Sequence, residues 1–155
     1  MKSIPLTRGS FAIVDDADYE RVSRRKWHAH SRGYACSSVT NIDGAHGTIL
    51  LHRFVLGLSG RTEIDHVNRN KLDCRRSNLR ICSRSQNLHN TKRRSDSSNA
   101  YRGVSFSKEK RKWVAYIDVG GKRIRLGYFD SAEEAARKRD DVARKTVGEF
   151  ATLNF

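Results

Sequence analysis

An Asp-His pair, Asp65-His66, follows a short β-type run and sets a carboxylate beside an imidazole. Asparagines follow at Asn78, after a polar loop, and at Asn87, close to the start of a predicted helix. A carboxylate, an imidazole and a carboxamide are the groups that hydrolysis of a phosphodiester with one hard metal ion would need. These residue types and their order therefore favour a phosphodiester hydrolase. The same residues would also fit a turn followed by a capped helix that has no catalytic role.

Two short strands and one helix must bring these groups together. The run before Asp65 predicts the first strand, and residues 79–82 predict the second, with a polar loop between them. Ser83 or Ser85 then begins a helix that carries Asn87. Neighbours on a strand point to opposite faces, but the twist at a strand end can let both line one cleft. The sequence thus predicts a ββα unit.

Charge indicates the kind of partner. The 155 residues include 31 Lys and Arg against 17 Asp and Glu, a formal net charge of +14, and the basic residues run along the whole chain. A basic excess of this size is typical of proteins that bind nucleic acid. A basic structural protein or a ribosomal-type RNA binder is the alternative. At 37% hydrophobic residues the chain can fold, as one medium domain or as two to three small modules.

The three cysteines, Cys36, Cys74 and Cys82, are odd in number and have no Cys-x-x-Cys spacing. This argues against a disulfide framework or a zinc knuckle and favours a reducing compartment. No apolar run approaches the roughly 20 residues that a membrane span needs, and no charged-then-apolar leader opens the chain. We expect a cytoplasmic protein with no membrane partner.

Residues 1–50 predict a β-rich segment. Asp15 is expected to cap a helical turn. Trp27 and Tyr34 are expected to anchor a core. The expected strands are 9–14, 26–30, 34–36 and 48–51, with a hairpin turn at 41–44.

Two segments flank the predicted ββα unit. Residues 51–57 predict a short helix that ends near Gly57 or Gly60. His52 on this helix could contact DNA or satisfy a buried hydrogen bond, and the structural role is favoured. Residues 91–98 are polar and basic without periodicity, which is typical of a linker, and their charge suggests that they lie along a phosphate backbone.

Residues 99–155 predict a second folded module. Three strand-like runs are followed by Ser131 and Glu134 at capping-box spacing, and then by a helix with a stripe of alanines. Arg139 interrupts that stripe. A three-stranded antiparallel sheet packed on one helix is the expected result. The strands are expected at 101–106, 113–119 and 123–129, with a turn at Gly120-Gly121.

Several motifs occur together in residues 46–94, namely His52-Arg53, Asp65-His66, Asn70, Asn78-Leu79-Arg80, and Gln86-Asn87 with Asn90. In this combination they resemble the HNH endonuclease family, and in particular its phage and intron-associated homing branch. The third family position is often His. The family spacing after Asn78 lands on Asn87, which indicates the H-N-N variant, and His89 stays open as an alternative.

The resemblance implies a role for each of these groups. His66 would be the general base that draws a proton from the attacking water. Asp65 and Asn87 would hold one divalent metal ion, Mg²⁺ or Mn²⁺, since oxygen ligands favour hard cations. Asn78 would orient His66 or tie the loop together by hydrogen bonding. No small-molecule cofactor is implied.

A second set of motifs lies in residues 99–155, namely Tyr101-Arg102-Gly103-Val104, Lys112-Trp113-Val114-Ala115, Leu126-Gly127-Tyr128-Phe129, Ala135-Ala136, and Gly148 with Asn154-Phe155. They resemble the plant ethylene-response-factor (APETALA-type) DNA-binding domain over nearly its full length. The resemblance implies that the three-stranded sheet enters the major groove of DNA. Ser105, Tyr116, Asp118 and Arg125 differ from the usual contact residues, so the plant family's sequence preference does not transfer.

Strand alternation divides that sheet into two faces. Trp113, Ala115 and Ile117 would pack on the helix. Lys112, Val114, Tyr116 and Asp118 would face DNA. Over the whole chain, the residues expected to contact DNA are Arg53, Arg75, Arg76, Arg80, Arg84, Lys92, Arg93, Arg94, Arg102, Lys112, Tyr116, Arg123 and Arg125.

Together these features predict an α+β chain that acts as a site-specific, metal-dependent DNA endonuclease of homing type. With one site per chain it would nick one strand of double-stranded DNA, and we expect a monomer rather than a dimer. It would work in the cytoplasm of a phage-infected or bacterial host cell. The alternatives are a catalytically inactive DNA-binding regulator and an RNA-binding protein. The expected parts are a β-rich N-terminal segment (1–50), an HNH ββα-metal nuclease core (51–90), a basic linker (91–98) and an APETALA-like DNA-binding domain (99–155).

Overall fold

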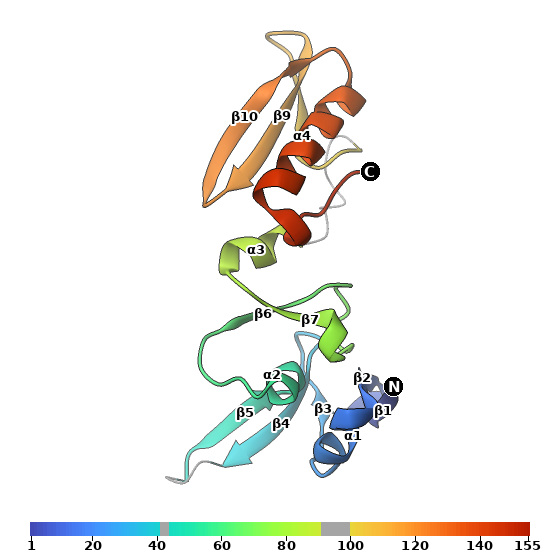
Figure 1. The fold of residues 1–155 in the computed structure, drawn as a ribbon. Coiled ribbons are helices and arrows are strands. Elements are labelled where there is room, and N and C mark those ends of the chain that lie inside the picture. The colour runs from blue at the N-terminus through green and yellow to red at the C-terminus, as the bar shows by residue number, and fades with distance from the viewer. Residues whose placement is uncertain (41–43, 91–99) are drawn as a thin grey trace. The chain divides into compact units, whose positions relative to one another are not determined.

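The computed structural model describes residues 1–40, 44–90 and 100–155, except the side chain of His89. The hairpin turn predicted at 41–44 and the linker predicted at 91–98 therefore fall largely or wholly outside the described residues. The chain contains both helices and strands (Figure 1), which is compatible with the predicted α+β class. It divides into two compact units, Met1–Cys82 and Ser83–Phe155.

The first unit consists of three small antiparallel sheets and two short helices. The sheets have the strand orders β1-β2, β3-β4-β5 and β6-β7. The 3₁₀ turns η1 (Thr7–Gly9) and η2 (Arg76–Asn78) complete the unit. Its elements are β1 (Lys2–Pro5), β2 (Phe11–Val14), α1 (Asp16–Ser23), β3 (His28–Ala29), β4 (Ala35–Thr40), β5 (His46–Leu50), α2 (Leu51–Leu56), β6 (Glu63–His66) and β7 (Leu79–Cys82).

The core of this unit draws on both its N-terminal half and the β6–β7 hairpin. Leu51 and Val55, one helical turn apart on α2, are fully buried. Trp27 lies in the same core, as predicted, and its indole N–H donates to the Val22 carbonyl at 2.9 Å. Gly57 ends α2 in the left-handed conformation, at φ 67°, which glycine adopts without strain.

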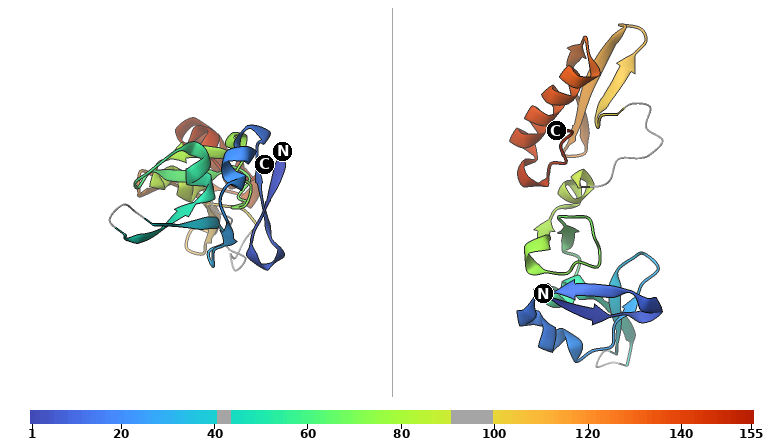
Figure 2. Two further views of the ribbon diagram at one scale, coloured as in Figure 1. Left: turned by 90° about the horizontal axis from the view of Figure 1, so that it is seen from below. Right: turned by 90° about the vertical axis from the view of Figure 1, so that its right-hand side faces the viewer.

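Strand β1 was missed in the sequence because only one of its four side chains, Ile4, is buried. It pairs with β2 from Lys2 opposite Val14 to Pro5 opposite Phe11. The blue β1–β2 hairpin is visible in Figure 2. A strand stabilised by such pairing needs little apolar pattern of its own, so period-two alternation does not reveal it.

Strand β2 also holds the loop between β6 and β7. The Ile13 N–H donates to the Leu72 carbonyl, and the Cys74 N–H donates to the Ile13 carbonyl, both at 2.8 Å. Ile13 and Asp73 thus form an isolated parallel bridge. The N-terminal segment is therefore part of the frame on which this loop is built.

Asp15 does not act as the predicted side-chain cap of α1. It occupies the N-cap position, but its carboxylate makes no capping hydrogen bond to the helix. It accepts the backbone N–H of Arg76 instead, at 2.7 Å. The carboxylate thus binds an N–H that is distant in the sequence rather than the N–H groups of its own helix. A local capping pattern cannot predict this.

The second unit contains α3 and a three-stranded sheet with α4 along one of its faces (Figures 1 and 2). Ser83 caps α3 in a capping box with Gln86, and Ser131 caps α4 by accepting the Glu134 N–H. Its elements are α3 (Arg84–His89), β8 (Val104–Ser107), β9 (Lys112–Val119), β10 (Lys122–Phe129), α4 (Ala132–Thr146) and the 3₁₀ turn η3 (Gly148–Phe150), and the strand order is β10-β9-β8.

The core of this unit joins Val104 and Ala115 of the sheet to Ala135 and Ala136 of α4, with Trp113 packed against them. One prediction about which side chains lie on the exposed face of the sheet is wrong. Val114, expected on the exposed face, is only 2% exposed. It lies on the central strand β9, opposite Ser105 of β8 and Tyr128 of β10, so a strand flanks it on each side.

Arg139 interrupts the apolar stripe of α4, and the fold accommodates its charge inside the protein. Its guanidinium donates to Asp140 at 3.0 Å and to the Thr152 carbonyl at 2.6 Å. Asp140 in turn accepts the backbone N–H groups of Asn154 and Phe155. The buried pair therefore anchors the last residues of the chain to α4.

All three cysteines are buried and none forms a disulfide. Over the described residues, no helix combines the length and the apolar character needed to cross a membrane.

Candidate active site

The β6–β7 hairpin places Asp65 and His66 at the end of β6. Asp65 lies opposite Arg80 of β7, and His66 lies opposite Leu79. Leu79 is buried in the core of the first unit, which fixes the hairpin to that core. Asp65 and His66 are each 5% exposed, so an acidic and an imidazole side chain occupy adjacent positions at one strand end, largely shielded from water.

Arg80 pairs with Asp65 across the ladder. Its Nε and Nη2 both donate to Oδ2 of Asp65, at 2.9 and 2.7 Å. Two charge-assisted hydrogen bonds on one oxygen fix the orientation of the carboxylate and offset its charge. Arg80 was expected to hold a DNA phosphate, and the structure instead directs its guanidinium to the carboxylate beside His66.

His66 has an environment that keeps its imidazole neutral. Burial lowers its pKa below the usual value of 6.5, and the nearby charges of Asp65 and Asp73 only partly oppose that shift. At neutral pH the ring is therefore in the deprotonated form. That is the form in which an imidazole can accept a proton from water.

Asn78 ties together the loop that joins β6 to β7. Its side-chain oxygen accepts the Asn68 N–H at 2.9 Å, and its side-chain NH₂ donates to the Asp73 carbonyl at 2.7 Å. Its backbone carbonyl accepts the Val67 N–H at 2.9 Å. One buried carboxamide thus connects both ends of the loop that follows His66.

Asp73 is the buried charge at the centre of this loop. Arg75 donates to both of its carboxylate oxygens, at 2.8 and 2.6 Å, and Asn68 donates to one of them at 2.8 Å. These bonds, with Arg75 first, lower the pKa of Asp73. Arg75 was expected to contact DNA, and its guanidinium stabilises the loop.

Asp18 of α1 is a second buried carboxylate that organises the site from a distance. Arg76 donates to both of its oxygens at 2.8 Å, and Arg21 donates to one at 2.9 Å. Both arginines also donate to the Val55 carbonyl at the end of α2. The hydrogen bond from Arg76 is the main reason that the pKa of Asp18 lies below its usual value. Arg76 thus connects η2, which carries Asn78, to α1 and α2.

The other basic residues predicted around the hairpin are placed differently. Arg53 donates to the carbonyls of Thr62 and Gly60, and so holds the turn before β6. Arg84 is exposed on α3. Lys92, Arg93 and Arg94 lie outside the described residues.

Asn87, the predicted second metal ligand, lies on α3. That helix belongs to the second unit, whereas Asp65 and His66 belong to the first. Asn87 is half-buried. The side chain of its rival, His89, lies outside the described part of the chain. The choice between the two remains a prediction.

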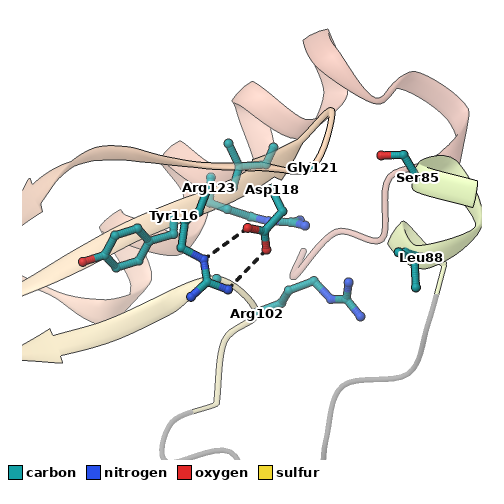
Figure 3. A pocket seen from close by; sticks show the side chains of 10 residues that line it. Ser85, Leu88, Arg102, Tyr116, Asp118, Gly121 and Arg123 are labelled. Carbon is teal, nitrogen blue, oxygen red and sulfur yellow. Dashed lines mark hydrogen bonds and ion pairs between the residues drawn. The ribbon is translucent and has the colours of Figure 1, made fainter.

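Cationic side chains of the sheet pair with acidic or aromatic neighbours. Arg123 donates to both oxygens of Asp118, at 3.1 and 3.3 Å (Figure 3). Arg125 donates to the Tyr128 hydroxyl at 3.0 Å, and its guanidinium lies 5.2 Å from the centre of that ring. Lys112, also predicted to contact DNA, pairs with Asp130 at 3.0 Å.

A pocket of about 400 Å³ opens beside this face, within the second unit (Figure 3). Arg102, Tyr116 and Arg123, all predicted to contact DNA, line it together with Ser85 and Leu88 of α3. The pocket therefore gathers the predicted contact residues of β9 and β10 with those of the segment before β8.

Residues 58–89, which include the β6–β7 hairpin and α3, match the family model of the HNH endonucleases. The chain is also 31% identical, over 153 residues, to an uncharacterized HNH endonuclease of Acanthamoeba polyphaga mimivirus, a match that covers 95% of this chain and 76% of that protein. The chain belongs to the HNH endonuclease family. It is therefore a nuclease enzyme, with Asp65 and His66 inside the matching segment.

This HNH endonuclease also resembles two plant proteins over a shorter stretch. It is 43% identical over 58 residues to APETALA2-like protein 2 of Oryza sativa and to an AP2-like ethylene-responsive transcription factor of Arabidopsis thaliana. Each match covers 37% of this chain and 12 to 13% of the plant protein. The similarity to plant transcription factors is thus partial.

HNH nucleases generally use a divalent metal ion. In the parts of the chain that the structure describes, no three His, Cys, Asp or Glu side chains form a ligand cluster. Hard cations prefer carboxylate and carboxamide oxygens. Asp65 supplies a carboxylate, whose Oδ2 already accepts two hydrogen bonds from Arg80.

Sequence reasoning missed the two buried carboxylates that hold the site of this HNH endonuclease. Asp73 has a local signal, because Arg75 lies two residues away. Asp18 has none, because its partner Arg76 is 58 residues away. The ring contacts of His66 with Tyr34 and His52 were missed for the same reason.

Proposed function

We propose that this HNH endonuclease is a homing-type enzyme that cuts DNA at a specific site, nicking one strand of the duplex with one divalent metal ion. The observation that carries the proposal is the buried Asp65–His66 pair on the β6–β7 hairpin, within the segment that matches the family. One such pair in the chain supports one cut per binding event. The net charge of +14 supports DNA as the polyanion.

His66 would act as the general base. Its neutral imidazole accepts a proton from the attacking water, whose oxygen bonds to phosphorus while the bond to the 3′ oxygen breaks. Asp65 and Asn87 would hold Mg²⁺ or Mn²⁺, which when bound would stabilise negative charge on the phosphate and the leaving oxygen. Asn78 and Asp73 hold the loop behind His66, and Arg80 fixes the orientation of Asp65.

The specificity would come from the C-terminal part of the chain. We propose that residues 99–155 form an AP2-type DNA-binding domain whose sheet reads the target in the major groove. The partial similarity to the plant factors supports this. So does the exposure of Arg123, Arg125 and Tyr128 on β10, while α4 packs against the opposite face.

The nuclease proposal predicts metal-dependent nicking of a supercoiled plasmid that carries the target. With Mg²⁺ or Mn²⁺ the intact chain should convert the plasmid to the open circle, and EDTA should prevent this. Asp65→Ala should bind the DNA but nick it more slowly, because one metal ligand and the partner of Arg80 are lost. Asp16→Ala, an exposed aspartate of the same unit, is the matched control and should nick normally.

Three outcomes distinguish the nuclease from the two alternative functions. Nicking that stops with EDTA supports the endonuclease. Tight duplex binding without nicking in any metal, equal for the intact chain and Asp65→Ala, indicates a DNA-binding regulator. Preference for single-stranded RNA over duplex DNA indicates an RNA-binding protein.

The sheet proposal predicts that Arg125→Ala weakens target binding. A guanine contact would be worth about 1–3 kcal/mol and would be lost together with discrimination at one base pair. A phosphate contact would instead weaken all sequences alike and lower the salt slope by about 1. Both are read from binding isotherms at several salt concentrations. Arg144→Ala on α4 removes the same charge, and an equal effect on target binding would contradict the proposal.

A further inference from the structure

Three rings from three separate elements meet at the predicted base. His66 ends β6, His52 lies on α2, and Tyr34 directly precedes β4. The imidazoles of His52 and His66 are nearly perpendicular, at 87°, with centroids 5.0 Å apart. The Tyr34 ring lies 5.3 Å from His52 and 6.0 Å from His66, tilted to both. Edge-to-face contacts at these distances are the favoured arrangement of aromatic rings.

His52 contributes a buried, uncharged ring to this cluster. It is 4% exposed, and its Nδ1 is buried with no hydrogen-bond partner among the described residues. Burial lowers the pKa of His52 to about 3, so the ring is neutral at neutral pH. The expectation that His52 satisfies a buried hydrogen bond is therefore wrong for this nitrogen.

The position of His52 is itself rigid. Its neighbours on α2, Leu51 and Val55, are fully buried in the core of the first unit. Tyr34 is fixed by Lys71, whose ammonium lies 4.6 Å from the centre of the phenol ring and donates to the Arg32 carbonyl at 2.9 Å. Both rings are thus supported by groups that make no contact with the substrate in the proposed mechanism.

We propose that His52 and Tyr34 are positioning residues that hold the His66 imidazole in the orientation needed to meet the attacking water. The inference rests on the proposed role of His66 as the base. A buried imidazole can still turn about the bond to its Cβ, and both nitrogens move when it does. Rings packed at two angles remove those alternatives. A misplacement of about 1 Å at a reacting group can cost on the order of 100-fold in rate.

Substitutions at His52 separate ring shape from nitrogen chemistry. His52→Phe keeps an edge-to-face ring and removes both nitrogens, whereas His52→Gln keeps a polar side chain and removes the ring. His52→Ala removes both. Because the buried Nδ1 makes no hydrogen bond, we expect His52→Phe to nick within about threefold of the wild type, and His52→Gln and His52→Ala to be about 10- to 100-fold slower.

The measurement is single-turnover nicking at saturating protein, with the dissociation constant for DNA determined separately. The slow variants should lose rate and keep DNA affinity, and their thermal unfolding midpoints show whether they are folded. If His52→Ala does not fold, the comparison of His52→Gln with His52→Phe carries the test. In a His66→Ala background, adding His52→Ala should slow nicking no further, since the effect of His52 is transmitted through His66.

The outcomes are distinct. His52→Phe as slow as His52→Ala, or an additive effect in the His66→Ala background, overturns the positioning role and leaves His66 as the base. If His66→Ala nicks DNA at the wild-type rate, the proposed base is wrong and so is the positioning role. Rescue by phenylalanine together with no further loss in the double variant supports the inference.

Discussion

Replacing His66 with alanine should slow single-turnover nicking by about 10²- to 10⁴-fold, the range that a positioned general base contributes. The neutral imidazole next to Asp65 is the group of the first unit best placed to take a proton from water. Burial has already shifted its pKa in the direction that keeps it deprotonated. The loss should appear in the rate at saturating protein and not in DNA affinity, because the proposed role does not involve holding the DNA.

His46→Ala is the matched control. His46 is an exposed histidine of β5, whose contact is with the Thr40 hydroxyl. Its removal should leave the nicking rate unchanged. Equal nicking by His66→Ala and the wild type would refute the assignment of the base, even if Asp65→Ala were inactive.

Replacing Asp18 with asparagine should lower the free energy of unfolding of the first unit by about 2–3 kcal/mol. Removing one partner of a buried ion pair typically costs about 3–5 kcal/mol. Here the cost is smaller because Arg21 and Arg76 are about half exposed, at 47% and 52%, and water can solvate them. The measurement is denaturant unfolding followed by tryptophan fluorescence in a Trp113→Phe background, which leaves Trp27 as the only tryptophan.

The same pair predicts the pH dependence of stability. The pKa of Asp18 in the folded protein lies below its usual value of 3.8, so its contribution is present above that value and is lost as the pH falls below it. The wild type should therefore lose stability more steeply than Asp18→Asn on acidification below about pH 4. Asp73 shifts in the same direction, so the difference between the two proteins isolates Asp18.

Asp16→Asn, on the same helix, is the control for both measurements. Asp16 is exposed and pairs with the N-terminal ammonium at the surface, an interaction worth about 0–1 kcal/mol. If Asp16→Asn and Asp18→Asn proved equally stable, the buried network would contribute nothing to the fold.

Structural features that depend on neighbouring residues were predicted correctly from the sequence. Strand β7 covers the same residues as predicted, α2 ends at Gly57, and Ser131 caps α4. Each depends on a few neighbouring residues. Apolar alternation, a glycine at positive φ and a serine before a helix act through contacts within one or two turns of chain.

Contacts between residues that are far apart in the sequence were not predicted. The local pattern predicts that Asp15 caps a helix, yet its carboxylate accepts the backbone N–H of Arg76. The sequence predicts phosphate contacts for Arg75, Arg76 and Arg80 because these arginines flank the proposed catalytic residues. The structure directs each to a buried carboxylate, and only Arg75 has that partner nearby in sequence. A side chain's partner is decided by tertiary structure, which a single sequence leaves open.

The hydrogen bonds between β2 and the loop at Leu72–Cys74 limit which segment of this nuclease can be moved into another protein. The family match begins at residue 58, but the hydrogen bonds of Ile13 and the carboxylates of Asp15 and Asp18 hold the loop from the N-terminal side. A cassette cut at the family boundary would carry Asp65 and His66 without their support. Exchange of the cutting module between proteins should therefore start at Met1 and extend through α3, which carries the proposed metal ligand Asn87.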